Sequence, residues 1–186
     1  VVLGKKEFLK PLLLFSAMSM PFMSYLATSS FIFQDGFGVS AQAYSLFFAF
    51  NACSSLMGPL SHLYLLRHLP RNTVICAHLA LMSAAGIMLL VLGGKGPWFF
   101  ALLFAPICYC GSALRPPSTM LMMQSIKGDN GIVASLINCG GLLFGSLSMF
   151  IASLAIWPNP ILAVGCIAAT VSGICLVFWL KIKKDY

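Results

Sequence analysis

The stretch ILAVGCIAATVSGICLVFWL, residues 161–180, holds twenty consecutive residues without a charged side chain. A helix of about 20 apolar residues is long enough to cross the hydrocarbon core of a bilayer. The stretch does not alternate polar and apolar residues, as the strands of a transmembrane barrel do. It therefore predicts a membrane-spanning α-helix, which we expect to extend over residues 158–180.

Five further apolar segments precede this one and occupy most of the chain. Of the 186 residues, 60% are hydrophobic and 8% are charged, whereas a soluble domain carries about a quarter charged residues. So few polar side chains could not cover the surface of a soluble fold. We therefore predict an all-α, polytopic membrane protein made of a single six-helix transmembrane bundle over residues 1–186. The expected spans are 11–33, 41–66, 73–93, 97–124, 131–156 and 158–180.

The Lys and Arg residues are divided unequally between the two ends of this bundle. If the six segments cross the membrane in turn, Lys95 falls at one end and nine other cations fall at the end that holds the N-terminus. Loops rich in Lys and Arg stay in the cytoplasm, so both termini are expected to be cytoplasmic. The nine are Lys5, Lys6, Lys10, Arg67, Arg71, Lys127, Lys181, Lys183 and Lys184.

Small residues and prolines indicate how the helices pack and bend. Gly141 and Gly145 form a G-x-x-x-G pair, and Gly165, Ala169 and Gly173 repeat this spacing in the last segment. Such stripes allow two helix backbones to approach closely in lipid. Prolines inside the segments each remove one backbone hydrogen bond, and several kinked helices fit a moving transporter better than a rigid anchor. These prolines are Pro21, Pro59, Pro106, Pro116 and Pro117.

The sequence shows no pattern that is typical of a cofactor site. The seven cysteines all fall in apolar segments, and neither a C-x-x-C pair nor a zinc-like His/Cys spacing occurs. A Gly-rich phosphate loop and a nucleophile elbow are also missing. We therefore expect no cofactor, no metal and no enzymatic activity. The net charge of +7 is explained by orientation in the membrane and contact with anionic lipid, so we expect the bilayer and not nucleic acid as a partner.

Residues 29–58, SSFIFQDGFGVSAQAYSLFFAFNACSSLMG, carry a pattern that resembles the seventh and eighth spans of a major facilitator superfamily transporter. The pattern is most similar to the drug:proton antiporter branch, although a proline of that branch is replaced at or beside Ser30. The residues that match are Ser30, Phe31, Ile32, Gln34, Gly38, Ser40, Ser45, Phe48, Ala49, Asn51, Ala52 and Gly58, with Tyr44 as the aromatic.

Two later stretches extend this resemblance. Residues 65–71, LLRHLPR, resemble the basic loop after the eighth span, without its acidic residue, and residues 131–145 are similar to the start of the eleventh. The resemblance implies the C-terminal half of a twelve-helix transporter, built as a three-plus-three inverted repeat, whose N-terminal six-helix half is absent from this chain. It also implies a cavity lined mainly by the first, second, fourth and fifth segments.

Arg115 stands in the apolar stretch CGSALRPPSTMLMMQS, residues 110–125, about ten residues or roughly 15 Å from the cytoplasmic end of its segment. A cation at such a depth costs at least about 2.5–3.5 kcal/mol. Pro116 and Pro117 free two carbonyl groups one turn earlier. Two interpretations remain open. Arg115 either faces a central cavity, where it binds an anionic group or pairs with an acid of the other half, or it extends toward the inner headgroups.

The other candidate substrate-binding residues are uncharged. Met20, Met23 and Tyr25 cluster near the middle of the first segment, and methionine and aromatic side chains adapt to varied apolar ligands. Ordinary packing or contact with lipid is the alternative. Asn51 either contacts substrate or forms a hydrogen bond to a neighbouring helix, and for Asn138 we favour the structural role.

The acidic residues all lie at the ends of segments or beyond them, at Glu7, Asp35, Asp129 and Asp185. Proton-coupled transport requires a titrating group inside the membrane. We therefore expect the coupling acid in the N-terminal half, and His62 and His78 are either proton relays or packing residues.

Together these observations predict the C-terminal half of a secondary active transporter in the bacterial cytoplasmic membrane. We expect proton-coupled efflux of drugs or small organic molecules by alternating access. The alternative is a non-transporting six-helix membrane scaffold or assembly subunit, and an intramembrane enzyme is disfavoured.

Overall fold

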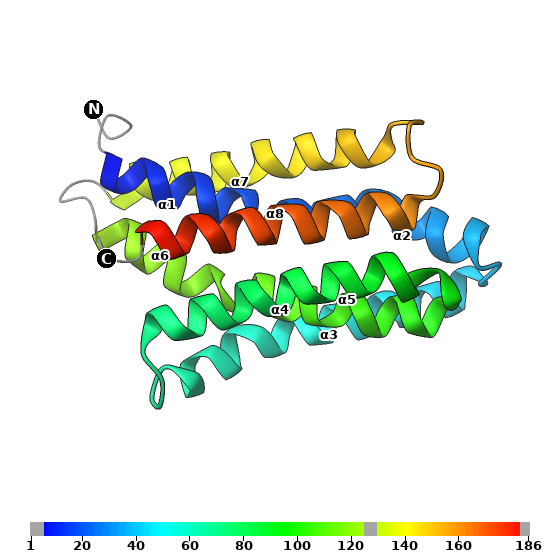
Figure 1. Cartoon of the computed structure of the whole chain (residues 1–186), viewed down its shortest axis with the longest axis horizontal. Helices are drawn as coiled ribbons and strands as arrows, with labels where there is room; N and C mark the ends of the chain where they lie inside the picture. Colours follow the sequence, from blue (N-terminus) through cyan, green and yellow to red (C-terminus); the bar gives the residue numbers. More distant parts are fainter. Residues whose placement is uncertain (1–5, 125–129, 183–186) are drawn as a thin grey trace.

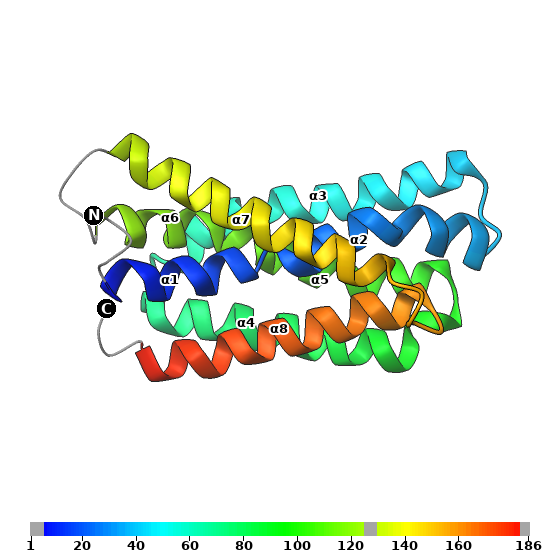
Figure 2. The same cartoon turned by 90° about the horizontal axis from the view of Figure 1, so that it is seen from above.

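The computed structural model of the chain describes residues 6–124 and 130–182, which form long helices that run side by side (Figures 1 and 2). No strand occurs in these two ranges, so the expected all-α class is confirmed. The elements are α1 (Lys6–Ala17), α2 (Met20–Ser30), the π-helix η2 (Phe31–Gly36), α3 (Ala41–Leu65), α4 (Arg71–Leu92), the short η3 (Gly93–Lys95), α5 (Pro97–Ala113), α6 (Arg115–Gln124), α7 (Asn130–Ser153) and α8 (Pro160–Ile182).

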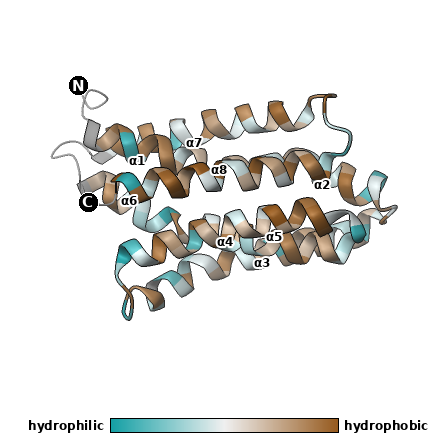
Figure 3. Ribbon diagram, viewed as in Figure 1, coloured by the Kyte–Doolittle hydropathy of each residue, from teal (hydrophilic) through white to brown (hydrophobic). Residues whose placement is uncertain are grey.

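Several of these helices have the length and composition of membrane spans. Five helical ranges are long and apolar enough to cross a bilayer, namely Phe8–Gly36, Arg71–Lys95, Pro97–Met123, Gly131–Ser153 and Pro160–Ile182. Hydrophobic residues run along the length of the helices, whereas hydrophilic residues are more frequent near their ends (Figure 3). The structure is therefore compatible with an integral membrane protein of helical type.

Helix α3 is not among these five ranges, although its 25 residues are long enough to cross. Its composition is the reason, because it holds Gln42, Asn51, His62 and several serines among its apolar residues. Crossing of the membrane by α3, and with it the six-span count, stays a prediction.

The connections between the helices alternate between two ends of the bundle. The start of α1, the turn between α3 and α4, and the end of α8 lie together at one end, which we name the terminal end (Figure 1). Arg67, Arg71 and Lys181 lie there. Asp35 in η2 and Lys95 in η3 lie at the opposite end, which we name the far end. Lys5, Lys127, Asp129, Lys183, Lys184 and Asp185 lie outside the described residues.

Two of the expected segments are broken in the middle. The first divides at Met18 and Ser19, between α1 and α2, just before Pro21. The fourth divides at Leu114, between α5 and α6, just before two consecutive prolines. A proline donates no backbone hydrogen bond and crowds the preceding turn, which explains both positions. Pro59 and Pro106 behave differently, since α3 and α5 continue through them.

Small residues hold α4 against α8, the pair of helices with the most extensive contact. A Cβ atom added to Gly86 would lie 2.5 Å from the backbone nitrogen of Ala169, and one added to Gly165 would lie 2.7 Å from Leu90. The small-residue stripe expected in the last segment therefore does face a close neighbour. The stripe in α7 is less uniform, because Gly145 packs against Met23 while a Cβ on Gly141 would meet nothing within 4 Å.

We expect Gly86→Ala to lower the free energy of unfolding by about 1–3 kcal/mol, because the new methyl group meets backbone that cannot move aside. The measurement is the thermal unfolding midpoint of the detergent-solubilised protein. Gly141→Ala is the matched control, since it also lies inside a long helix but has open space, and it should leave the midpoint unchanged or raise it slightly. Equal effects of the two substitutions would contradict the close packing of α4 on α8.

Candidate functional site

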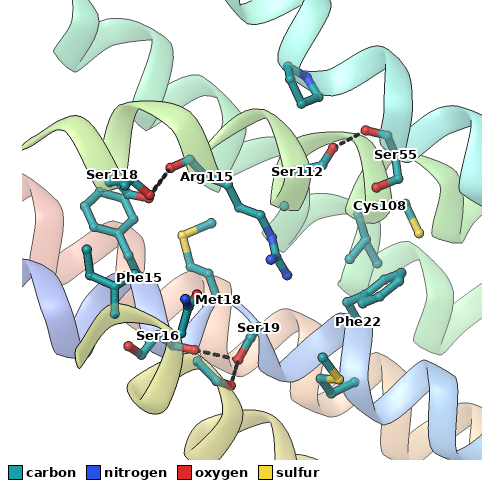
Figure 4. Close-up of a pocket in the computed structure, with 18 of the residues that line it drawn as sticks. Phe15, Ser16, Met18, Ser19, Phe22, Ser55, Cys108, Ser112, Arg115 and Ser118 are labelled. Carbon is teal, nitrogen blue, oxygen red and sulfur yellow. Dashed lines mark hydrogen bonds between the residues drawn. The ribbon is translucent and has the colours of Figure 1, made fainter. Parts of the chain in front are cut away.

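An open cavity of about 1160 Å³ lies between the helices (Figure 4). Its lining comes from α1, α2, α3, α5, α6 and α7, and Met82 is the one described lining residue from α4. These helices correspond to the first, second, fourth and fifth segments, the four that the family resemblance implied for a central cavity. The volume lies just above the range of about 300–1,000 Å³ that is usual for sites of drug-sized ligands, so the cavity is large enough for such a ligand.

Aromatic side chains fill the bundle between this cavity and the far end. The ring of Phe33 lies 5.0 Å from that of Phe47 and 5.4 Å from that of Phe100, measured between centroids. Tyr25 stacks on Phe104 with a centroid distance of 4.2 Å. Phe33, Phe100 and Phe104 are fully buried, so aromatic packing closes the cavity on the side of the far end.

Both helix breaks border the cavity. Ser19, at the break between α1 and α2, donates its hydroxyl to the carbonyl oxygens of Ser16 and Gly141, at 2.7 and 2.8 Å. Ser112, in the last turn of α5, donates to the carbonyl oxygen of Ser55 in α3. The carbonyl oxygen of Ser55 has no helical donor because Pro59 stands four residues later, and the Ser112 hydroxyl takes that place. The Ser19 and Ser112 hydroxyls also tie α2 to α7 and α5 to α3 around the opening.

Arg115 is the first residue of α6, and its side chain reaches into the cavity (Figure 4). Its carbonyl oxygen accepts hydrogen bonds from the hydroxyls of Ser118 and Thr119, at 2.7 and 3.0 Å. Within residues 6–124 and 130–182, the guanidinium makes no ion pair or hydrogen bond. The position is the one that the cavity interpretation requires, whereas binding of an anion there stays a prediction.

Two other candidates, Met23 and Asn138, also line the cavity. Met23 projects from α2 and packs against Gly145, while Asn138 is exposed on α7. The structure thus brings Arg115, Met23 and Asn138 to one space from three different segments. Substrate binding by any of them stays a prediction.

The remaining three candidates lie away from the cavity lining. Asn51 is 2% exposed and donates its side-chain amide to the hydroxyl of Tyr25, at 3.1 Å, and Tyr25 itself is 1% exposed. The pair therefore joins α3 to α2 within the core. Met20 is partly buried and packs against Ala152 and Ala163 of α7 and α8. These placements favour the packing interpretation for all three.

The two histidines inside the segments meet at the interface of α3 and α4. The rings of His62 and His78 lie 6.0 Å apart between centroids, and His78 stacks on Tyr109 at 5.8 Å. His78 Nδ1 lies 2.7 Å from the carbonyl oxygen of Val74, while both ring nitrogens of His62 are buried without a partner among the described residues. The two histidines are thus in direct contact, and a proton-relay role for them stays a prediction.

Several lining residues were not singled out by sequence reasoning. They are chiefly Phe22 of α2, Met122 of α6 and the hydroxyls of Ser19 and Ser112. The available signal was the prolines, because Ser19 precedes Pro21 by two residues and both breaks fall at the cavity. No pattern within one segment could show that Ser112 faces α3.

No family model matches the chain, and neither the comparison with curated proteins nor that with solved structures gives a match. The relation to the major facilitator superfamily is therefore a resemblance of motifs only.

The two asparagines are expected to differ in their effect on stability. Asn51→Ala should lower the free energy of unfolding by about 1–3 kcal/mol, because it removes a buried hydrogen bond and leaves the Tyr25 hydroxyl without its donor. Asn138→Ala should have no measurable effect, since that side chain is exposed to the cavity. Thermal unfolding of the two detergent-solubilised variants measures the difference, and similar midpoints would contradict the separation of Asn51 from the cavity.

Proposed function

We propose that this chain is the C-terminal half of a secondary active transporter that exports drugs or other small organic molecules by alternating access. The observation that carries the proposal is the cavity of about 1160 Å³, closed by aromatic packing on one side and containing a charged side chain. A rigid scaffold or assembly subunit requires no such space, and an apolar bundle gains stability when its interior is filled.

The pattern of neighbouring helices supports an inverted three-plus-three repeat. The most extensive contacts join α4 to α8, α3 to α5, and α2 to α7, which are the third and sixth, second and fourth, and first and fifth segments. If the first, second and third segments are exchanged with the fourth, fifth and sixth, respectively, the same three pairs of neighbouring segments result. Two less extensive contacts follow the same rule, because this exchange converts the pair of α4 and α5 into the pair of α8 and α2. The first and fourth segments, which correspond under this exchange, are the two broken ones.

Exposed apolar surface beside the cavity supports the second half as a partner. Leu56 and Leu60 of α3 and Leu142 of α7 line the cavity, yet they are 71%, 65% and 64% exposed. The second and fifth segments thus flank an opening that another apolar surface can cover. A second six-helix bundle would complete the cavity there and would rock against this one.

The proposal includes the orientation of the chain in the membrane and the location of its proton-coupling group. The cations at the terminal end favour a cytoplasmic location for both termini of the chain, in a bacterial cytoplasmic membrane. The aromatic packing then faces the outside and the cavity opens toward the cytoplasm. Among the described residues that line the cavity there is no Asp or Glu. A proton-coupling carboxylate is therefore assigned to the N-terminal half.

Alternating access can be tested without knowledge of the substrate. We expect Gly111→Cys, on the cavity lining and with open space for a side chain, to react with a membrane-impermeant thiol reagent added from either side of the membrane. The full protein is used, with its native cysteines replaced by alanine and an unchanged unfolding midpoint. The control is Ile174→Cys, 69% exposed on α8, which should react from neither side because lipid covers it. Reaction of Gly111→Cys from a single side only would contradict alternating access and favour the scaffold.

The crossing by α3 has a separate test. In the same cysteine-free protein, Asp35→Cys and His68→Cys place thiols at exposed positions before and after this helix. We expect impermeant reagents to label Asp35→Cys from outside and His68→Cys from the cytoplasm. Labelling of both from the same side would show that α3 does not cross, and the six-span topology would be wrong.

A further inference from the structure

We infer that the cavity binds amphipathic organic anions, with Arg115 as the residue that holds the anionic group. The inference rests on the proposed transport function and adds the chemical class of the substrate to it. Three observations carry the inference: the charge balance of the lining, the hydrogen bonds that its hydroxyls already make, and the apolar character of the remaining wall.

The charge of the lining is positive, and no carboxylate is present among the described lining residues. Arg115 is the one charged side chain among the described residues that line the cavity. Asp35 lies at the far end, in η2, away from the cavity. Arg115 is exposed to the open cavity, and its positive charge attracts an anion and repels a cation that enters there.

Several hydroxyls around Arg115 are already engaged, and the guanidinium is the charged donor among the described lining residues. The hydroxyls of Ser19, Ser112 and Ser118 all donate to backbone carbonyl oxygens, so their protons are already engaged. A guanidinium presents five N–H donors in a planar arrangement and binds a carboxylate or sulfonate through two parallel hydrogen bonds. With one charged donor among the described lining residues, the arrangement suits a ligand with a single anionic group better than a polyanion.

The rest of the wall suits an apolar body attached to that anionic group. Phe22 and Met23 line the α2 side, and Met82 and Met122 lie on α4 and α6. Methionine side chains adapt their shape and polarise against aromatic rings, which permits ligands of varied outline. An amphipathic monoanion satisfies both parts of the cavity, whereas an amphipathic cation satisfies only the apolar part.

Three probes with one naphthalene body test this selectivity. They are 1-naphthylacetate, its neutral amide 1-naphthylacetamide, and the cation 2-(1-naphthyl)ethylammonium. Binding is measured by naphthalene fluorescence with the full protein in nanodiscs of phosphatidylcholine, which removes anionic lipid as a competitor. We expect the anion to bind at least tenfold more tightly than the cation. Addition of phosphatidylglycerol to the nanodiscs should not abolish binding of the anion, and complete displacement would instead assign the site to a lipid headgroup and overturn the inference.

Substitutions at Arg115 separate a role in binding from a structural role. Arg115→Gln should weaken binding of the anion roughly 10- to 100-fold and leave binding of the neutral amide unchanged. Arg115→Lys should restore part of the loss, because it keeps the charge without the paired hydrogen bonds. Arg67→Ala, which removes an exposed cation outside the cavity, is the control and should change nothing.

Two further results would overturn the inference. One is a wild-type protein that does not prefer the anion to the cation, at whatever strength either binds. The other is an equal loss of anion and amide binding in Arg115→Gln, which would mean that Arg115 pairs with an acid of the other half. Uptake of the probes into proteoliposomes tests the proposed function separately. Anion binding without transport would contradict the transporter, while transport of the cation alone would contradict only the substrate class.

Discussion

The requirement that every backbone hydrogen bond be satisfied inside the protein governs this structure. In hydrocarbon no water can replace a missing hydrogen-bond partner, so the backbone forms helices, in which these bonds are made internally. A break in a helix is tolerated only where protein or a cavity surrounds it. The two interruptions follow this rule. Ser19 and Leu114 mark them, both lie beside the cavity, and serine hydroxyls donate to carbonyl oxygens next to each. The helices are therefore interrupted at the depth where the cavity lies, and the two observations have the same cause.

The same requirement explains why the polar residues of the bundle divide into two groups. Asn51 and the Tyr25 hydroxyl bond to each other inside the core, where water has no access. Arg115 and Asn138 lie at the cavity, where water or a ligand can solvate them. A buried polar group without a partner is costly, so the group that is paired by its neighbours belongs to the core. His62 is the exception, because its two ring nitrogens have no partner among the described residues although it lies outside the cavity lining.

Much of the helical framework could be predicted from the sequence, because charge-free runs such as residues 161–180 leave no alternative in a bilayer. A kink at Pro116 and Pro117 could be predicted, and the helix break falls just before them, at Leu114. The cost of a charge in hydrocarbon gave a cavity at Arg115 as one of two interpretations, and Arg115 does line the cavity. Pro59 showed the limit of this reasoning, since α3 continues through it. The pairing of Asn51 with Tyr25 was also beyond reach, because it depends on the rotation of two helices about their axes. No single-segment pattern determines that rotation.

The order in which the helices meet has a consequence for how the protein is made. Helix α3 packs mainly on α5, α2 on α7, and α4 on α8, so each early helix finds its main neighbour much later in the chain. During synthesis the first three helices would reach the membrane while their partners are still on the ribosome. Helix α3 is the long helix that is not among the five apolar ranges. It would depend most on protection from lipid by the insertion machinery until α5 is synthesised. An interrupted translation product should consequently be a target for membrane quality control rather than a smaller stable protein.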